Sequence, residues 1–157
     1  MMRLSKREVT DPQIIREILE ECKVCRIAMI GNAAPYIVPM NYGYYWDEQG
    51  LRLYLHCASE GRKLELMRKH SQVGFEMDCG HTLIEGKQAC DYSFSYASVI
   101  GSGTVSIRES VEGKREGLQR IMEHLTGKTE FLLDEKIVER TTVLELRCEE
   151  ITCKRHL

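Results

Sequence analysis

The chain has 157 residues, 43% hydrophobic and 29% charged, with a formal net charge of −2. These values suit one globular domain over residues 1–157 and exclude a disordered, collagen-like or coiled-coil chain. No basic stripe for nucleic acid appears, and no apolar run approaches the roughly 18 residues that cross a membrane. The first 20 residues lack the apolar core of a signal peptide, so we expect a cytoplasmic protein.

The first third of the chain predicts one helix followed by strands. Asp11 is placed to cap the helix and Pro12 to begin it, since apolar residues recur at helical spacing as far as Cys22. Alternating or β-branched residues then predict three strands, at 24–30, 36–46 and 51–56.

A short helix is expected over 60–70 with Ser59 as its cap, and a fourth strand over 73–77. Residues 79–94 show little periodicity and are predicted to form a loop. The remaining elements are a strand at 96–108, helices at 112–125 and 131–139, and a strand at 142–154.

Details of these last elements indicate a small barrel. Gly101 and Gly103 fall on the apolar face of their strand, where a closed barrel bends, and a change of parity near Glu149 predicts a bulge. The helix at 112–125 is expected to turn four residues inward: Leu118, Ile121, Met122 and Leu125. Six strands with isolated helices between them make no βαβ series, so we predict a mainly β, six-stranded antiparallel barrel with helices packed outside.

The strongest candidate site begins where the third strand ends. His56 closes that strand, small residues follow, and a helix then begins with Gly61, Arg62 and Lys63. Two cations in the first turn oppose the helix dipole, and a phosphate held between them would explain their presence. A solvated basic surface is the alternative interpretation.

A second candidate is the segment around Pro39. Proline removes a ladder hydrogen bond, so Pro39 is expected at a sheet edge, a bulge or a gap in the barrel. Free backbone groups there could meet the polar edge of a flat heterocycle, although an ordinary edge strand is the favoured interpretation of this segment by itself.

Three motifs in order resemble a known family. They are Val38-Pro39-Met40-Asn41-Tyr42, Leu53-Tyr54-Leu55-His56 with Gly61-Arg62-Lys63, and Tyr96-x-Ser98-Val99-Ile100-x-Gly-x-Gly. Together they resemble the FMN-binding split β-barrel proteins related to pyridoxamine 5′-phosphate oxidase, and most closely the nitroimidazole-resistance (Nim) branch. The resemblance extends over nearly the whole chain.

The resemblance implies that the chain binds FMN. Arg62 and Lys63 would hold the phosphate, with Gly61 allowing close approach, and the backbone of Val38, Pro39, Met40 and Asn41 would lie along the ring. His56, Cys57 and Ala58 would line the flavin, and Ser98 would contact it from the strand at 96–108. The family forms homodimers whose interface holds the flavin, and His56 is the candidate catalytic, proton-handling residue.

The resemblance predicts a reductase that takes electrons from a small-molecule reductant and passes them to a small electrophile such as a nitroaromatic. Oxidation of pyridoxamine phosphate is disfavoured, because the extra basic residues of the oxidases have no clear equivalent. The chain departs from the Nim pattern at Cys153, where a glycine is expected before Lys154, and this leaves the role of Lys154 open. A non-catalytic flavin- or haem-binding module is the alternative.

Two further interpretations rest on other residues. Cys22 and Cys25, with Cys79 and His81, supply four potential zinc ligands, and Cys22-x-x-Cys25 has the spacing of a redox motif. That motif normally follows a strand and opens a helix, which is the reverse of the order predicted here, so buried free cysteines are favoured. The aromatic run Tyr42–Trp46 could stack on single-stranded nucleic acid, but core or dimer interface is the preferred interpretation.

Overall fold

The computed structural model describes residues 5–157, so residues 1–4 of the predicted domain lie outside it. The helices are α1 (Pro12–Glu21), α2 (Arg62–Lys69), α3 (Val111–Thr126) and α4 (Glu135–Arg140), with 3-10 turns at Ser5–Arg7 and Ala89–Asp91. The strands are β1 (Glu8–Val9), β2 (Cys25–Met29), β3 (Tyr36–Met40), β4 (Gly43–Asp47), β5 (Gly50–Cys57), β6 (Gln72–Ile84), β7 (Ser93–Ile107) and β8 (Thr142–His156).

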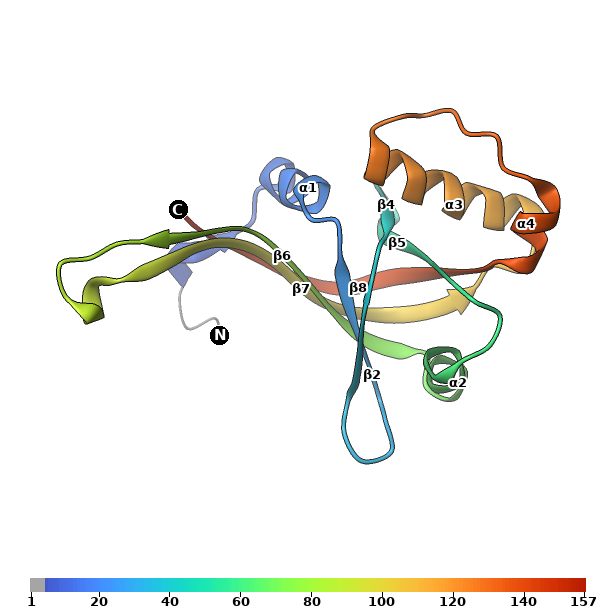
Figure 1. Cartoon of the computed structure of the whole chain (residues 1–157), viewed down its shortest axis with the longest axis horizontal. Helices are drawn as coiled ribbons and strands as arrows, with labels where there is room; N and C mark the ends of the chain where they lie inside the picture. The colour runs from blue at the N-terminus through green and yellow to red at the C-terminus, as the bar shows by residue number, and fades with distance from the viewer. Residues whose placement is uncertain (1–4) are drawn as a thin grey trace.

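All strand pairs are antiparallel, in the order β3-β2-β6-β7-β8-β5-β4, with β1 added to β8. The long strands β6, β7 and β8 run across the molecule in Figure 1, with α1 and α3 on one side of them and α2 on the other. The structure confirms the predicted antiparallel, mainly β architecture with helices outside. No helix among residues 5–157 is long and apolar enough to cross a membrane.

The core lies on the inner face of the curled sheet. Alternate residues of β5, Leu51, Leu53 and Leu55, are at most 3% exposed and pack with apolar residues of the other strands. The position of Gly101 beside this core requires a glycine, because an added Cβ would lie 2.5 Å from the Phe75 ring. Ser102 pairs with Glu150 and Gly103 with Cys148, so Glu149 is the extra residue and the predicted bulge is confirmed.

The strand predicted over 36–46 is in fact two strands at opposite edges of the sheet. The chain leaves β3 at Asn41, whose amide donates to the carbonyl of Lys23 over 2.9 Å. Tyr42 is fully buried and its hydroxyl donates to the carbonyl of Leu19 over 2.6 Å. These tertiary contacts redirect the chain although the alternation continues. With this segment divided and the short strand β1 added, residues 5–157 hold eight strands where six were predicted.

The prediction of a loop over 79–94 is wrong. β6 continues to Ile84 and pairs with β7 from Ser93, which makes a hairpin arm that projects from the rest of the molecule (Figure 1). The register shifts between Cys79 and Thr82, where Gly80 has a φ of 70°. Because of this register shift and the exposure of the arm, the sequence of residues 79–94 lacks the alternation of apolar and polar residues that predicts a strand.

Two helix predictions also need correction. α2 begins after Gly61, at a φ of 134° and without a side-chain cap, so Ser59 is not its cap; Asp11 does cap α1, accepting from Gln13 N over 2.8 Å. The residues that α3 buries are Gly113, Gly117, Ile121 and His124, whereas Leu118 and Met122 are half-buried and Leu125 is exposed. Glycine lets α3 approach so closely that a Cβ at Gly117 would lie 2.6 Å from Val143 Cγ1.

Candidate functional site

The start of α2 is joined to strand β3. The guanidinium of Arg62 lies 4.4 Å from the centroid of the Tyr36 ring, and Tyr36 is the first residue of β3. Among residues 5–157, neither Arg62 nor Lys63 has a carboxylate within 4.0 Å. Two cations without ion-pair partners therefore lie beside the free N–H groups of the helix, an arrangement suited to an anion.

Strand β3 is an edge of the sheet, so Pro39 occupies one of the predicted positions. Its neighbour across the ladder is Arg26 of β2, and no strand pairs with the other side of β3 in the described chain. Val38 and Met40 turn toward the core, whereas Pro39 and Asn41 are exposed. The outer edge of β3 therefore presents unpaired backbone groups along the segment that the sequence indicated.

His56 and Cys57 end β5 but face opposite sides of the sheet. Cys57 is only 8% exposed, and burial raises the pKa of its thiol while the charges of Lys63 and Arg68 oppose that rise. His56 is exposed and pairs across the ladder with Val143 of β8. Both side chains lie on the face of the sheet that α3 packs against, since Gly117 of α3 lies close to Val143. Ala58 is exposed in the turn that leads to Gly61.

Ser98 lies far from this group within one chain. It is opposite Asp78 and Lys154, whereas His56 is opposite Val143 on the same strand β8. Those two β8 positions are eleven residues apart, about 35 Å along an extended strand. Ser98 is also three strands away from β3, roughly 14 Å across the sheet. The structure thus groups the α2 residues with β3 and leaves Ser98 apart.

Two features of the structure were not predicted from the sequence, the position of Tyr36 and a charged cluster on the outer face of the sheet. Asp78 accepts from Arg26 over 2.5 Å and lies 2.7 Å from His81 Nε2. Strand alternation placed Tyr36 on the same face as Val38, but the contact with Arg62 depends on how α2 packs. The cluster could not be predicted because its histidine, His81, falls in the segment 79–94, where the sequence shows no strand periodicity.

Among the hollows that residues 5–157 form, two border the β2–β3 connection and the aromatic run Tyr42–Trp46. One of about 540 Å³ is bordered by Ala28, Gly74 and the β2–β3 connection. Another of about 380 Å³ lies between α1, β4 and α3, where Arg16 lies 4.7 Å from the Trp46 ring and Arg120 4.5 Å from the Tyr45 ring. The aromatic run is thus divided between the core, which holds Tyr42, and rings that protein arginines already cover.

The cysteines do not gather around a metal. Among residues 5–157 no three Cys, His, Asp or Glu side chains are arranged to hold an ion, and all seven thiols are free. Burial raises the pKa of the thiols of both Cys22 and Cys79. His81 bonds to Asp78 instead of joining the cysteines.

Comparison with known proteins gives one family and one fold. Residues 11–155 match the family model described as pyridoxamine 5′-phosphate oxidase. A proposed 5-nitroimidazole antibiotic resistance protein from Bacteroides thetaiotaomicron is 32% identical, with a TM-score of 0.81 over 94% of this chain and 86% of that one. No curated protein sequence matches.

More distant structures share the fold alone. A flavocytochrome from Azotobacter vinelandii is 19% identical with a TM-score of 0.82, covering 100% of this chain and 72% of that one. An FAD-binding protein from Mesorhizobium loti is 17% identical with a TM-score of 0.64, covering 96% and 98%. The predicted split-barrel fold is confirmed, and the chain belongs to the pyridoxamine 5′-phosphate oxidase family.

Proposed function

We propose that this chain binds FMN and passes electrons from a small reductant to small electrophiles such as nitroaromatic compounds. The observation that carries the proposal is the Arg62–Tyr36 contact, which joins the cationic start of α2 to the free edge of β3. A phosphate at one end and a flat polar heterocycle at the other are what these two features suit.

The described residues fit the shape of such a ligand. Arg62 and Lys63 would bind the phosphate, and Gly61, where nothing lies within 4 Å of an added Cβ, leaves room for it. From Tyr36, the first residue of β3, to Asn41, the residue after its end, the chain makes five residue steps, about 17 Å, which is comparable to extended FMN. Bound flavin would supply the electron transfer, and the protein would orient it and exclude water.

The separation of Ser98 supports a homodimer. A flavin that Arg62 holds along β3 would lie at the edge of the sheet, three strands away from the Ser98 of its own chain. We therefore propose that Ser98 meets the flavin held by a second copy of the chain. Ile37 and Ile100, 60% and 52% exposed on the outer face, supply apolar surface for that contact.

His56 remains the candidate for handling protons beside the flavin. It is exposed at the end of β5, two residues before the turn that leads to Gly61. In this proposal His56 contacts the acceptor, whereas the buried thiol of Cys57 supports the start of α2.

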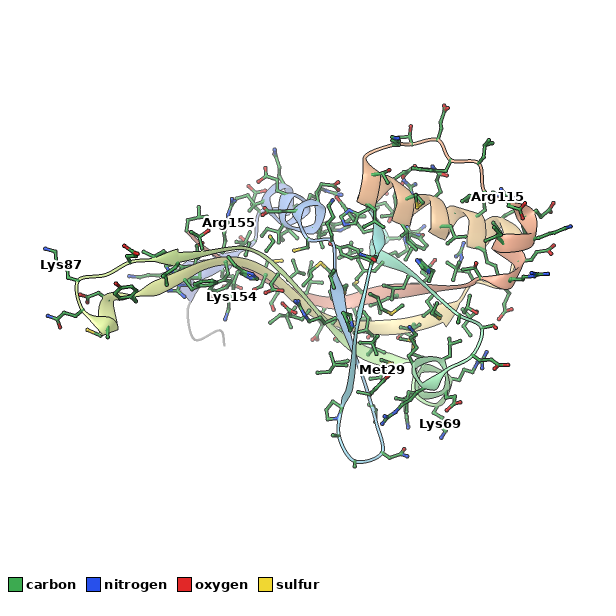
Figure 2. All side chains as sticks on the ribbon, in the orientation of Figure 1. Met29, Lys69, Lys87, Arg115, Lys154 and Arg155 are labelled. Carbon is green, nitrogen blue, oxygen red and sulfur yellow. The ribbon has the colours of Figure 1, made fainter. Side chains whose placement is uncertain are left out.

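The decisive measurement is the absorbance spectrum of purified protein, with titration of FMN into apoprotein. We expect a flavin spectrum that dithionite bleaches and a 5-nitroimidazole restores under anaerobic conditions. Arg62→Ala and Lys63→Ala should weaken FMN binding, while Lys69→Ala, at the far end of the same helix (Figure 2), should not. His56→Ala should keep FMN and slow turnover.

Each failure has its own meaning. A colourless protein that takes up no FMN would refute the proposal. Tighter binding of FAD or haem than of FMN would identify that molecule as the cofactor instead. Stoichiometric FMN without turnover over a panel of electron acceptors would leave a non-catalytic flavin module.

A further inference from the structure

The outer face of the sheet carries an ordered group of charged side chains that the flavin site does not explain. Asp78 of β6 lies 2.7 Å from His81 Nε2, and its other oxygen accepts from Arg26 over 2.5 Å. Arg26 also donates to Glu76 over 3.0 Å. His81 is 43% exposed and Asp78 26%, so the histidine is held at the surface with its free edge in solvent.

Several independent contacts fix the position of His81. The register shift between Cys79 and Thr82 turns it out of the ladder, and Gly80 adopts the left-handed conformation that this bulge requires. The hydroxyl of Ser95 donates to the Gly80 carbonyl over 2.8 Å and accepts from Thr82 N over 3.1 Å, which locks the bulge. The His81 ring also stacks on Phe94 at 5.9 Å. An exposed histidine held in this way pays an entropy cost that a merely solvated side chain avoids.

The position of this pair relates it to the proposed cofactor. Asp78 lies directly opposite Ser98 on the neighbouring strand, and residues paired in this way share one face of a sheet. On the same face Arg26 lies opposite Pro39 of β3. The pair is therefore one strand away from Ser98, which in the proposed dimer meets the flavin held by the second copy of the chain.

We propose that His81, positioned by Asp78, donates a proton to the substrate at the flavin that Ser98 contacts; this rests on the proposed flavin site. Reduction of a nitro group to nitroso consumes two electrons and two protons, breaks one N–O bond and releases water. The reduced flavin supplies the electrons. One of the two hydrogens comes with those electrons from the reduced flavin, the His81 imidazolium supplies the other as a proton, and solvent then reprotonates His81.

Charged side chains of both signs surround His81. Asp78, which bonds to His81, also pairs with Arg26, and Arg26 pairs in turn with Glu76. Glu21, at the end of α1 near Gly80, and Lys154, opposite Ser98, add one charge of each sign.

The test compares two electron acceptors on dithionite-reduced, FMN-loaded protein. A 5-nitroimidazole needs protons to be reduced, whereas ferricyanide accepts an electron without one. His81→Gln and Asp78→Asn should slow reoxidation by the nitroimidazole about 10- to 100-fold and flatten its pH profile. Reoxidation by ferricyanide should be unchanged. His70→Gln, an exposed histidine at the end of α2, is the control.

A second readout needs no turnover. NMR signals of the His81 ring should shift when FMN is titrated into the apoprotein, and those of His70 should not. His81 signals that stay fixed at FMN saturation, or equal slowing with both acceptors, would overturn the proton-donor role while leaving the flavin site intact. Absence of any flavin binding in the unaltered protein would overturn both proposals together.

Discussion

Replacing Tyr36 tests whether its ring acts on the cofactor through Arg62. The guanidinium lies 4.4 Å from the ring centroid, and such a contact at an exposed site contributes about 0.5–1 kcal/mol. If the ring only preorganises Arg62, Tyr36→Leu should weaken FMN binding about two- to fivefold. Tyr36→Phe keeps the ring face and should bind FMN as the unaltered chain does.

Arg62 itself should matter more than the ring that orients it. A hydrogen bond to a charged group contributes about 1.5–3 kcal/mol, so Arg62→Ala should raise the Kd for FMN by roughly 10- to 150-fold. Fluorescence titration of FMN measures each Kd. In the Arg62→Ala background, Tyr36→Leu should add no further loss. Additive losses would refute the reasoning, because they would mean that Tyr36 contacts the flavin independently.

Three further predictions concern the fold itself. Gly117→Ala should destabilise the protein by about 1–3 kcal/mol in urea unfolding, because its Cβ would lie 2.6 Å from Val143 Cγ1, whereas Glu112→Ala on the exposed side of α3 should have little effect. Burial lowers the pKa of His124, so the folded state resists protonation. Stability should therefore fall as pH drops from about 6.5 through the folded pKa, and His124→Gln should lessen that fall. In thiol labelling of native protein, exposed Cys90 should account for a fast phase that Cys90→Ser removes, while buried Cys25 and Cys153 react slowly.

Periodicity predicted most elements correctly because each strand buries one face. Leu51, Leu53 and Leu55 show a period of two that only a half-buried strand explains, and the parity change near Glu149 located the bulge without any structure. Periodicity failed where tertiary contacts decide the path. The break after Met40 depends on Tyr42 reaching Leu19, and no local signal marks it.

The candidate site shows the same division. Gly61, Arg62 and Lys63 are adjacent in sequence, so their joint position at the start of a helix could be inferred directly. The distance of Ser98 from His56 could not, because alternation gives the face of a residue and not its position along a partner strand. β7 and β5 both pair with β8, and only the register shows that Ser98 and His56 meet opposite ends of it.

Strand β3 connects stability with the proposed function. The free edge of β3, with its exposed Ile37, could pair with strands of other chains. Pro39 opposes such pairing because it lacks a backbone N–H donor within this strand. Ile37 nevertheless remains 60% exposed to solvent, and this exposure of an apolar side chain is unfavourable. A second copy of the chain or a flat cofactor would cover it. If so, FMN should lower the tendency of the protein to aggregate and raise its Tm in proportion to the logarithm of FMN concentration. An edge that stayed equally prone to aggregation with FMN bound would show that the cofactor lies elsewhere.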